Sequence, residues 1–313
     1  MNFNLPFRNK VKEADNLGFG TRITANHYRM IDKNGAFNVE KTGTSAWAPY
    51  QDLVEMSWGR FFLVVVAVFV LINAVFAVLL LLFGADCLDG VQPGALWAYF
   101  TQAWYFSVQT FTTVGYGSIS PVCTSTNLIA SAIALVGLLS FALATGLIFA
   151  RFSKPVARIV FSKVALIAPY KKETGFMFRF ANSRHHKLIN LEAKLTMSWV
   201  EKDQRGDKKR RYARLPLEVD KIAMMPLSWT IVHPIDSKSP LHEKTAADLE
   251  KMNLEIIVLV MGFDESFSQF VHANYSYCDE DLLWGKRFKM MYYPGENGKT
   301  VLNLDMIDEV MEP

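Results

Sequence analysis

From residue 61 to residue 150 the chain carries no Lys or Arg, and its acidic residues there are two aspartates. Two uncharged, mainly apolar runs, 61–83 and 128–149, lie inside this window. Each would form a helix roughly 33–35 Å long, which exceeds the hydrocarbon core of a bilayer at about 30 Å. Buried helices of soluble proteins are rarely this long and this free of charge. The pattern therefore predicts two membrane spans, an outer helix over 61–83 and an inner helix over 127–152.

The basic residues are distributed unevenly around these runs. Arg60 directly precedes the first run, several Lys and Arg residues follow the second, and none lies between them. By the positive-inside rule, both termini lie in the cytoplasm and residues 84–127 lie on or in the outer half of the membrane. Residues 1–60 are polar and charged without a cleavable signal peptide, so we expect the first span to act as the insertion signal. The net charge of +3 does not indicate nucleic acid binding.

A short motif between the two spans indicates what kind of membrane protein this is. Its residues are Thr113, Val114, Gly115, Tyr116 and Gly117. Successive backbone carbonyls that point the same way can replace the water shell of a potassium ion, and rings of such carbonyls form potassium filters. The two glycines supply the φ/ψ freedom that such a backbone needs. In a soluble protein this motif would indicate a strand and turn, but between membrane spans it predicts an ion filter.

The residues before the motif predict a re-entrant helix. Residues 93–112 are rich in aromatics and too close to the motif for a third crossing, while Pro93 suits a first helical position. Irregular backbone at membrane depth is tolerated only inside protein or against water, so we expect pore helix and filter over 93–117. The helix C-terminus would direct partial negative charge at the central cavity. An interfacial belt of aromatics is the alternative.

The segment before the first span has a different character. Residues 1–46 are predicted to form a largely irregular cytoplasmic arm. Residues 47–59 place apolar side chains near helical spacing, which predicts a short amphipathic slide helix on the inner membrane surface; an N-terminal extension of the first span is the alternative.

Cys87 and Cys123 bracket the pore segment on the outer side, and the sequence leaves open whether they form a disulfide or remain two thiols. Cys278 is expected to be a reduced core residue.

Beyond Lys163, short β-rich runs alternate with turn signals, which is the pattern of a β-sandwich. We therefore expect a pore domain over 60–155 and an all-β cytoplasmic domain over 156–313. A capping box at Thr245–Asp248 predicts one short helix, and the charged stretch 201–214 predicts a solvated hairpin loop. The predicted strands are Phe176–Phe180, Leu195–Val200, Tyr212–Val219, Leu227–Val232, Glu255–Met261, Phe270–Tyr277 and Arg287–Tyr293.

Enzymatic chemistry is not indicated. The six histidines lack metal-ligand spacing, and no nucleophile elbow, P-loop or Gly-x-Gly-x-x-Gly occurs. Neither span has an arginine ladder, so no voltage sensor is expected.

Two features of the inner helix could serve gating. Gly137 and Gly146 could act as hinges of the inner helix or permit close packing. Phe149 is the last large apolar residue before the cations, and a ring of four could close a pore by dewetting, although a lipid-facing position remains open.

Four cations, Arg60, Arg151, Lys154 and Arg158, would lie at the inner leaflet. Anionic lipid headgroups would attract each of them by about 1 kcal/mol. The alternative is that they only mark the topology.

From about Trp47 to Tyr293 the chain resembles the prokaryotic inward-rectifier-type potassium channels, the KirBac type. The resemblance rests on 113–117 and on five further motifs: Ala150–Pro155, His233–Asp236 with Ser239–Leu241, Asp264–Gln269, Val271–Ala273 and Trp284–Phe288.

The resemblance implies a homotetramer with an immunoglobulin-like cytoplasmic assembly in a bacterial inner membrane. It implies potassium coordination by the first four residues of 113–117, with no organic cofactor, and a gate at Phe149. It also implies phosphoinositide action at Arg151 and Lys154, inhibitory in prokaryotic members.

Three positions depart from the family pattern. Phe141 stands in the cavity where strongly rectifying relatives carry an acid, Gln109 stands behind the filter in place of Glu, and Ser118 follows the filter in place of Asp. Tight block by magnesium or polyamines is therefore doubtful. The leading hypothesis is passive, potassium-selective conduction through a four-fold pore that is gated by the inner-helix bundle, the cytoplasmic domain and membrane lipid and is blocked by barium. A weakly selective cation channel, or a membrane-anchored sensor with a ligand-binding β-sandwich, is the alternative.

Overall fold

The computed structural model describes residues 29–40, 42–43, 47–154, 157–184, 187–202, 206 and 208–313. The chain divides into two compact units. A helical unit consists of residues 43–154, and a β-rich unit combines residues 1–42 with residues 155–313. The helical unit is therefore an insertion, in sequence terms, between two parts of the β-rich unit.

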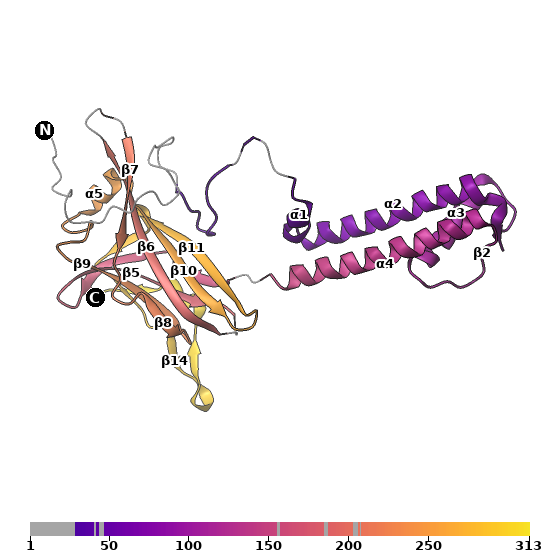
Figure 1. Ribbon diagram of the computed structural model, residues 1–313. Helices are drawn as coiled ribbons and strands as arrows, with labels where there is room; N and C mark the ends of the chain where they lie inside the picture. The colour runs from indigo at the N-terminus through magenta and orange to yellow at the C-terminus, as the bar shows by residue number, and fades with distance from the viewer. Residues whose placement is uncertain are drawn as a thin grey trace. The chain divides into compact units, whose positions relative to one another are not determined.

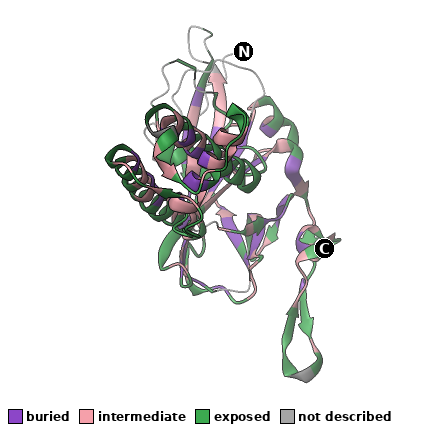
Figure 2. Ribbon diagram, turned by 90° about the vertical axis from the view of Figure 1, so that its right-hand side faces the viewer, coloured by how far each residue is buried: buried purple, intermediate pink, exposed green. Residues whose placement is uncertain are grey.

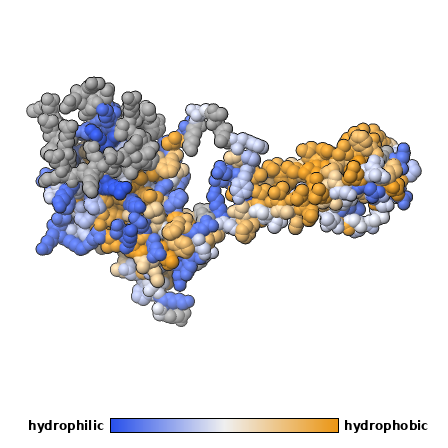
Figure 3. All heavy atoms as spheres, in the orientation of Figure 1, coloured by the Kyte–Doolittle hydropathy of each residue, from blue (hydrophilic) through white to orange (hydrophobic). Residues whose placement is uncertain are grey.

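Four helices make up the helical unit. They are α1 (Pro49–Glu55), α2 (Trp58–Gly84), α3 (Leu96–Phe111) and α4 (Thr124–Phe152). Both α2 and α4 are long and apolar enough to cross a membrane. Most of their side chains are exposed in the single chain (Figure 2), and apolar residues cover their surface (Figure 3). A helix pair that exposes this much apolar surface is suited to lipid or to further copies of the chain.

The short helix α3 packs against both long helices, at the end of the pair remote from α1 (Figure 1). Ala103, Phe106 and Phe111 of α3 form a buried cluster with residues of α2 and α4. The helix begins at Leu96 and not at Pro93 as predicted. The Gln102 side chain forms hydrogen bonds with the backbone N–H and carbonyl of Gln92, at 2.8 and 3.1 Å. These bonds hold the preceding segment outside the helix, and Ala95 keeps an extended backbone.

A disulfide joins Cys87 to Cys123, which settles the alternative that the sequence left open. It lies next to a two-stranded ladder of β1 (Leu88–Asp89) and β2 (Ser120–Pro121). The Thr126 hydroxyl in the first turn of α4 donates to the Cys87 carbonyl at 3.1 Å. The segments before α3 and after 113–117 are thus fastened together.

Two five-stranded sheets make up the body of the β-rich unit, in agreement with the predicted sandwich. One has the order β11-β10-β6-β7 with β8 on β6, and the other the order β12-β4-β5-β3 with β9 on β5. All of their pairings are antiparallel except β4 with β12. Their strands are β3 (Ile159–Phe161), β4 (Ala165–Tyr170), β5 (Glu173–Asn182), β6 (Leu188–Lys202), β7 (Lys208–Leu215), β8 (Lys221–Met224), β9 (Ser228–Ile235), β10 (Glu255–Asp264), β11 (Gln269–Cys278) and β12 (Leu282–Trp284).

The core of this unit is built from strand side chains that point inward at every second position. Phe176, Phe178 and Phe180 follow one another at every second position of β5, and all three are fully buried. The capping box at Thr245 and Asp248 starts helix α5 (Ala246–Lys251), as predicted. Strand β7 begins at Lys208, before the predicted run 212–219, and ends at Leu215. The charged stretch 201–214 was predicted as a loop, but its residues 201–202 and 208–214 form paired strand ends of the β6–β7 hairpin. The remaining short strands are β13 (Arg287–Phe288), β14 (Tyr292–Pro294), β15 (Thr300–Leu302) and β16 (Val310–Met311).

The described arm residues 29–40 have irregular backbone, as predicted, and they are docked on the strands of the β-rich unit. Ile31 is buried, and its carbonyl accepts a hydrogen bond of 2.7 Å from the Ser276 hydroxyl. The buried Glu255 carboxylate accepts the backbone N–H groups of Met30 and Ile31 at 2.9–3.2 Å. The arm prediction over residues 1–28 lies outside the described residues. Residues 29–40 therefore belong to the same packed body as the C-terminal strands.

Candidate functional site

The loop that follows α3 is fixed by the last turn of that helix. The carbonyl oxygen of Gln109 accepts the N–H groups of Val114 and Gly115 at 2.9 and 3.3 Å. The Thr112 N–H donates to the Val108 carbonyl at 2.9 Å. The loop backbone consequently starts at a position set by α3, and a rotation of this helix would move it.

The loop has an unusual backbone. Thr113, Gly115 and Gly117 have φ angles of +61°, +53° and +77°, and the residues between them are not in the left-handed region. In an extended strand, neighbouring carbonyls point to opposite sides; a change of hand at every second residue turns them to a common side. Such alternation produces a concave row of like backbone groups. We anticipated the glycines from sequence, but nothing in the sequence indicated a left-handed threonine.

In the single chain, the loop 113–117 is largely exposed. Val114 and Tyr116 are 52 % and 79 % exposed, and a Cβ atom on Gly115 or Gly117 would meet no atom within 4 Å. Among the described residues, no group of three or more His, Cys, Asp or Glu could hold a metal ion. In this part of the chain, backbone carbonyls and the Thr113 hydroxyl are the candidate ligands.

The two glycines of α4 differ in their surroundings. A Cβ atom on Gly137 would lie 2.1 Å from the Phe111 carbonyl oxygen at the end of α3, whereas one on Gly146 would meet nothing within 4 Å. The contact at Gly137 favours close packing over a hinge there. Phe141 and Phe149 expose about three quarters of their surface in the single chain, at 74 % and 72 %.

The predicted lipid-contacting cations have distinct environments. Arg151 donates to the carbonyl of Leu53, and to that of Met56 at 2.7 Å, so it fastens the end of α4 to α1. Its guanidinium also lies over the Trp58 and Phe61 rings, 4.5 and 4.6 Å from their centroids.

The other three cations are more accessible. Lys154 pairs with Glu55 at 2.9 Å, and Arg60 borders a shallow cavity with Asp52 and Glu55. Arg158 belongs to the β-rich unit, where it is exposed. The structure therefore brings Arg60, Arg151 and Lys154 to the α1 region.

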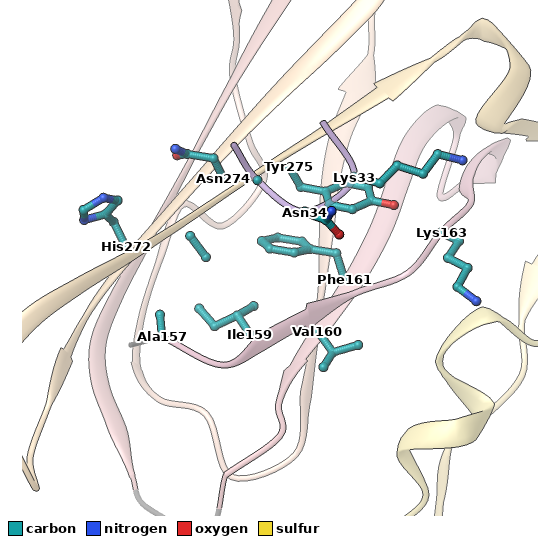
Figure 4. Close-up of a pocket in the computed structure, with 12 residues that line it drawn as sticks. Lys33, Asn34, Ala157, Ile159, Val160, Phe161, Lys163, His272, Asn274 and Tyr275 are labelled. Atoms are coloured by element: carbon teal, nitrogen blue, oxygen red, sulfur yellow. The ribbon is translucent and has the colours of Figure 1, made fainter. Parts of the chain in front are cut away.

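The β-rich unit contains a separate cavity of about 520 Å³, shown in Figure 4. Its walls come from the docked arm, β3 and β11. The stacked rings of Phe161 and Tyr275, with centroids 5.1 Å apart, form one wall. Burial raises the pKa of Tyr275 to about 12. Two lysines also line the cavity, but each forms an ion pair with an aspartate. Lys33 pairs with Asp281, and Lys163 pairs with Asp308.

Comparisons with known proteins agree with this architecture. Residues 65–154 match the family model described as "Ion channel", and residues 159–312 match the "Inward rectifier potassium channel C-terminal domain". The first match begins inside α2 and includes α3, the loop and α4, and the second spans the two sheets.

Three relatives match along most of the chain. The inward rectifier potassium channel Kirbac3.1 of Paramagnetospirillum magnetotacticum is 32 % identical over 94 % of this chain and 99 % of its own length. Inward rectifier potassium channel irk-1 of Caenorhabditis elegans is 26 % identical over 89 % of this chain and 56 % of its own length. The human ATP-sensitive inward rectifier potassium channel 15 is 27 % identical, over 93 % and 84 %.

Proposed function

The chain belongs to the inward rectifier potassium channel family, and from that premise we propose that it conducts potassium ions passively and selectively through a pore of four identical chains. The observation that carries the proposal is the alternation of backbone hand from Thr113 to Gly117. It turns successive carbonyls toward one side, where four copies would surround a dehydrated ion. A ring with closed symmetry requires identical chains to contribute the same loop.

We place this pore in a bacterial inner membrane with both termini in the cytoplasm. The support is the relation to Kirbac3.1, together with the cations that flank the two spans. We expect the filter to use the carbonyls of Thr113, Val114, Gly115 and Tyr116 with potassium as the transported substrate, and barium to block it.

The gate is proposed at the cytoplasmic end of α4. Four Phe149 rings meeting at the axis would expel water and stop ions. The exposed Phe149 and Phe141 side chains are available for this in the single chain. Gly146 has open space around its backbone and is the better candidate for a bend, whereas Gly137 is occupied by its contact with α3.

Anionic lipid is proposed to modulate this gate, with an inhibitory effect of phosphoinositides. Arg60, Lys154 and Arg158 would attract the headgroups, while Arg151 would transmit a movement of α1 to α4 through its hydrogen bonds to the Leu53 and Met56 carbonyls.

Flux measurements on the purified chain in liposomes test the proposal. We expect rubidium uptake that greatly exceeds sodium uptake, that barium blocks, and that phosphoinositide reduces. Gly115→Ala should abolish selectivity, because a side chain disfavours the left-handed backbone. Equal rubidium and sodium uptake would indicate the weakly selective cation channel. Flux at the level of empty liposomes would favour the membrane-anchored sensor.

A further inference from the structure

A buried polar contact joins the outer helix to the helix that carries the filter. Asn73 of α2 and Ser107 of α3 are both fully buried, and the Ser107 hydroxyl donates to Asn73 Oδ1 at 2.8 Å. Asn73 Nδ2 donates to the Phe69 carbonyl, one turn earlier in α2, at 2.9 Å. Both polar ends of the amide are thus satisfied within the protein.

This contact is unusual for its location. Asn73 lies near the middle of a helix that is otherwise almost entirely apolar. Polar side chains are disfavoured in a membrane span, and those that occur there commonly serve a function. An apolar residue of similar size would fill the space without having to satisfy an amide group. The position therefore calls for an explanation beyond filling of the core.

A second contact lies one helical turn away on both helices. The rings of Phe69 and Phe111 pack edge to face with centroids 5.4 Å apart. Phe69 and Asn73 are four residues apart on α2, as are Ser107 and Phe111 on α3, so the two contacts form neighbouring rungs. The edge-to-face packing of the two rings restricts their positions only loosely, because ring centroids in such pairs range over about 4.5–7 Å. The hydrogen bond is directional, and it therefore fixes the rotation and height of α3.

The orientation of α3 is passed on to the filter over a short distance. Gln109, two residues after Ser107, holds the Val114 and Gly115 N–H groups with its carbonyl. At the end of α3, the Phe111 carbonyl lies against the backbone of α4 at Gly137. Helix α3 is thus held by a hydrogen bond from α2 and by a backbone contact with α4.

We propose that Asn73 is a positioning residue for ion selectivity, acting through its hydrogen bond to Ser107. The inference rests on the proposed potassium conduction. The Ser107 hydroxyl anchors the pore helix, and the carbonyl of Gln109 carries this position to the filter backbone.

Asn73→Leu and Ser107→Ala test the proposal in full-length protein in liposomes, with the ratio of rubidium to sodium uptake as the readout. We expect each variant to lower the ratio by about three-fold or more, on the scale of a hydrogen bond between membrane helices. The double variant should be no worse than the more affected single variant, because both remove the same bond. Ser107→Cys, which keeps the side-chain size but weakens the donor, should resemble Ser107→Ala.

Thr101→Val is the matched control on the same helix. Within the described residues, the Thr101 hydroxyl bonds to the Ala98 carbonyl of its own helix, at 2.9 Å, and to no residue of α2 or α4, so this variant should keep the wild-type ratio. Variants that lose thermal stability but retain the wild-type ratio would overturn the positioning role and leave Asn73 as a helix fastener. Normal selectivity in Ser107→Cys would assign the effect to packing volume instead. A wild-type protein without selectivity would overturn the proposed function itself.

Discussion

The Phe111 carbonyl oxygen lies 2.1 Å from the point where a Cβ atom on Gly137 would stand. The pore helix and the inner helix therefore touch through their backbones. In the sequence, Gly137 and Gly146 look equivalent as two glycines in one apolar run, and only the structure separates them.

Gly137→Ala should displace the end of α3, since its methyl group cannot fit beside a backbone carbonyl. Overpacking of this kind lowers the free energy of unfolding by about 1–3 kcal/mol. We expect a lower melting temperature and reduced rubidium flux. Gly146→Ala serves as the control for the melting temperature, because its methyl group would meet no atom of the described residues within 4 Å. A similar fall in melting temperature in both variants would contradict the packing role.

Opening the Cys87–Cys123 disulfide should destabilise the outer end of the pore. The cysteines are 36 residues apart, and the chain-entropy model gives about 4 kcal/mol for a loop of this length. A Cys87→Ser, Cys123→Ser double variant should melt at a lower temperature than the oxidised protein. Dithiothreitol should lower the melting temperature of the wild type to that of the variant and leave the variant unchanged. Mass spectrometry that finds two free thiols in unreduced protein would rule out the bridge.

Arg60→Gln and Arg151→Gln should have different effects. Removing the Arg60 charge should weaken phosphoinositide inhibition about five-fold, from about 1 kcal/mol per cation at the membrane surface. Removing the Arg151 guanidinium should alter flux even without phosphoinositide, because the hydrogen bonds to the α1 carbonyls are lost. Dose–response measurements of flux would separate the two effects. An unchanged lipid-free flux in Arg151→Gln would argue against mechanical coupling.

The stability of the β-rich unit should fall in mild acid through His233. This ring is fully buried, with Nδ1 2.6 Å from the Pro216 carbonyl and Nε2 2.8 Å from the Ser239 hydroxyl. Burial lowers the pKa of His233, although the Pro216 hydrogen bond and Asp236 oppose the shift. The unfolded chain then binds more protons, so the stabilisation is complete above pH about 6.5 and decreases as the pH falls toward the folded pKa.

Denaturant unfolding at several pH values checks this prediction. The slope attributable to one histidine is at most about 1.4 kcal/mol per pH unit. His233→Gln cannot take up the proton and should give a flatter curve, with all other titrating groups unchanged. Parallel curves for the variant and the wild type would exclude His233 as the source.

Much of the fold follows from periodicity and charge. The two spans and the sandwich were predictable because an uncharged run and a two-residue alternation each persist over many residues. The start of α3 was not, since the side chain of Gln102 overrides the preference of Pro93 for a first helical position. The run 287–293, predicted as one strand, is divided between β13 and β14. The short strands β15 and β16 were missed, because two or three residues contain too little pattern.

The location of the candidate site was predictable from the sequence, but its backbone geometry and its contacts were not. The motif at 113–117 identified the loop, but the left-handed Thr113 depends on its tertiary surroundings. The engagement of Arg151 with α1 was equally hidden, because the residues involved are nearly one hundred positions apart. The docking of the arm was hidden for the same reason, as the buried Ile31 forms hydrogen bonds with Glu255 and Ser276 in the distant C-terminal strands.

The helical unit is covalently connected to the β-rich unit twice, before α1 and after α4. Arg151 ties α4 to α1 near both connections. In the channel that we propose, a turn of the β-rich unit would act on both connections at once. A signal that reorients this unit would then reach the ion path without a ligand entering the membrane.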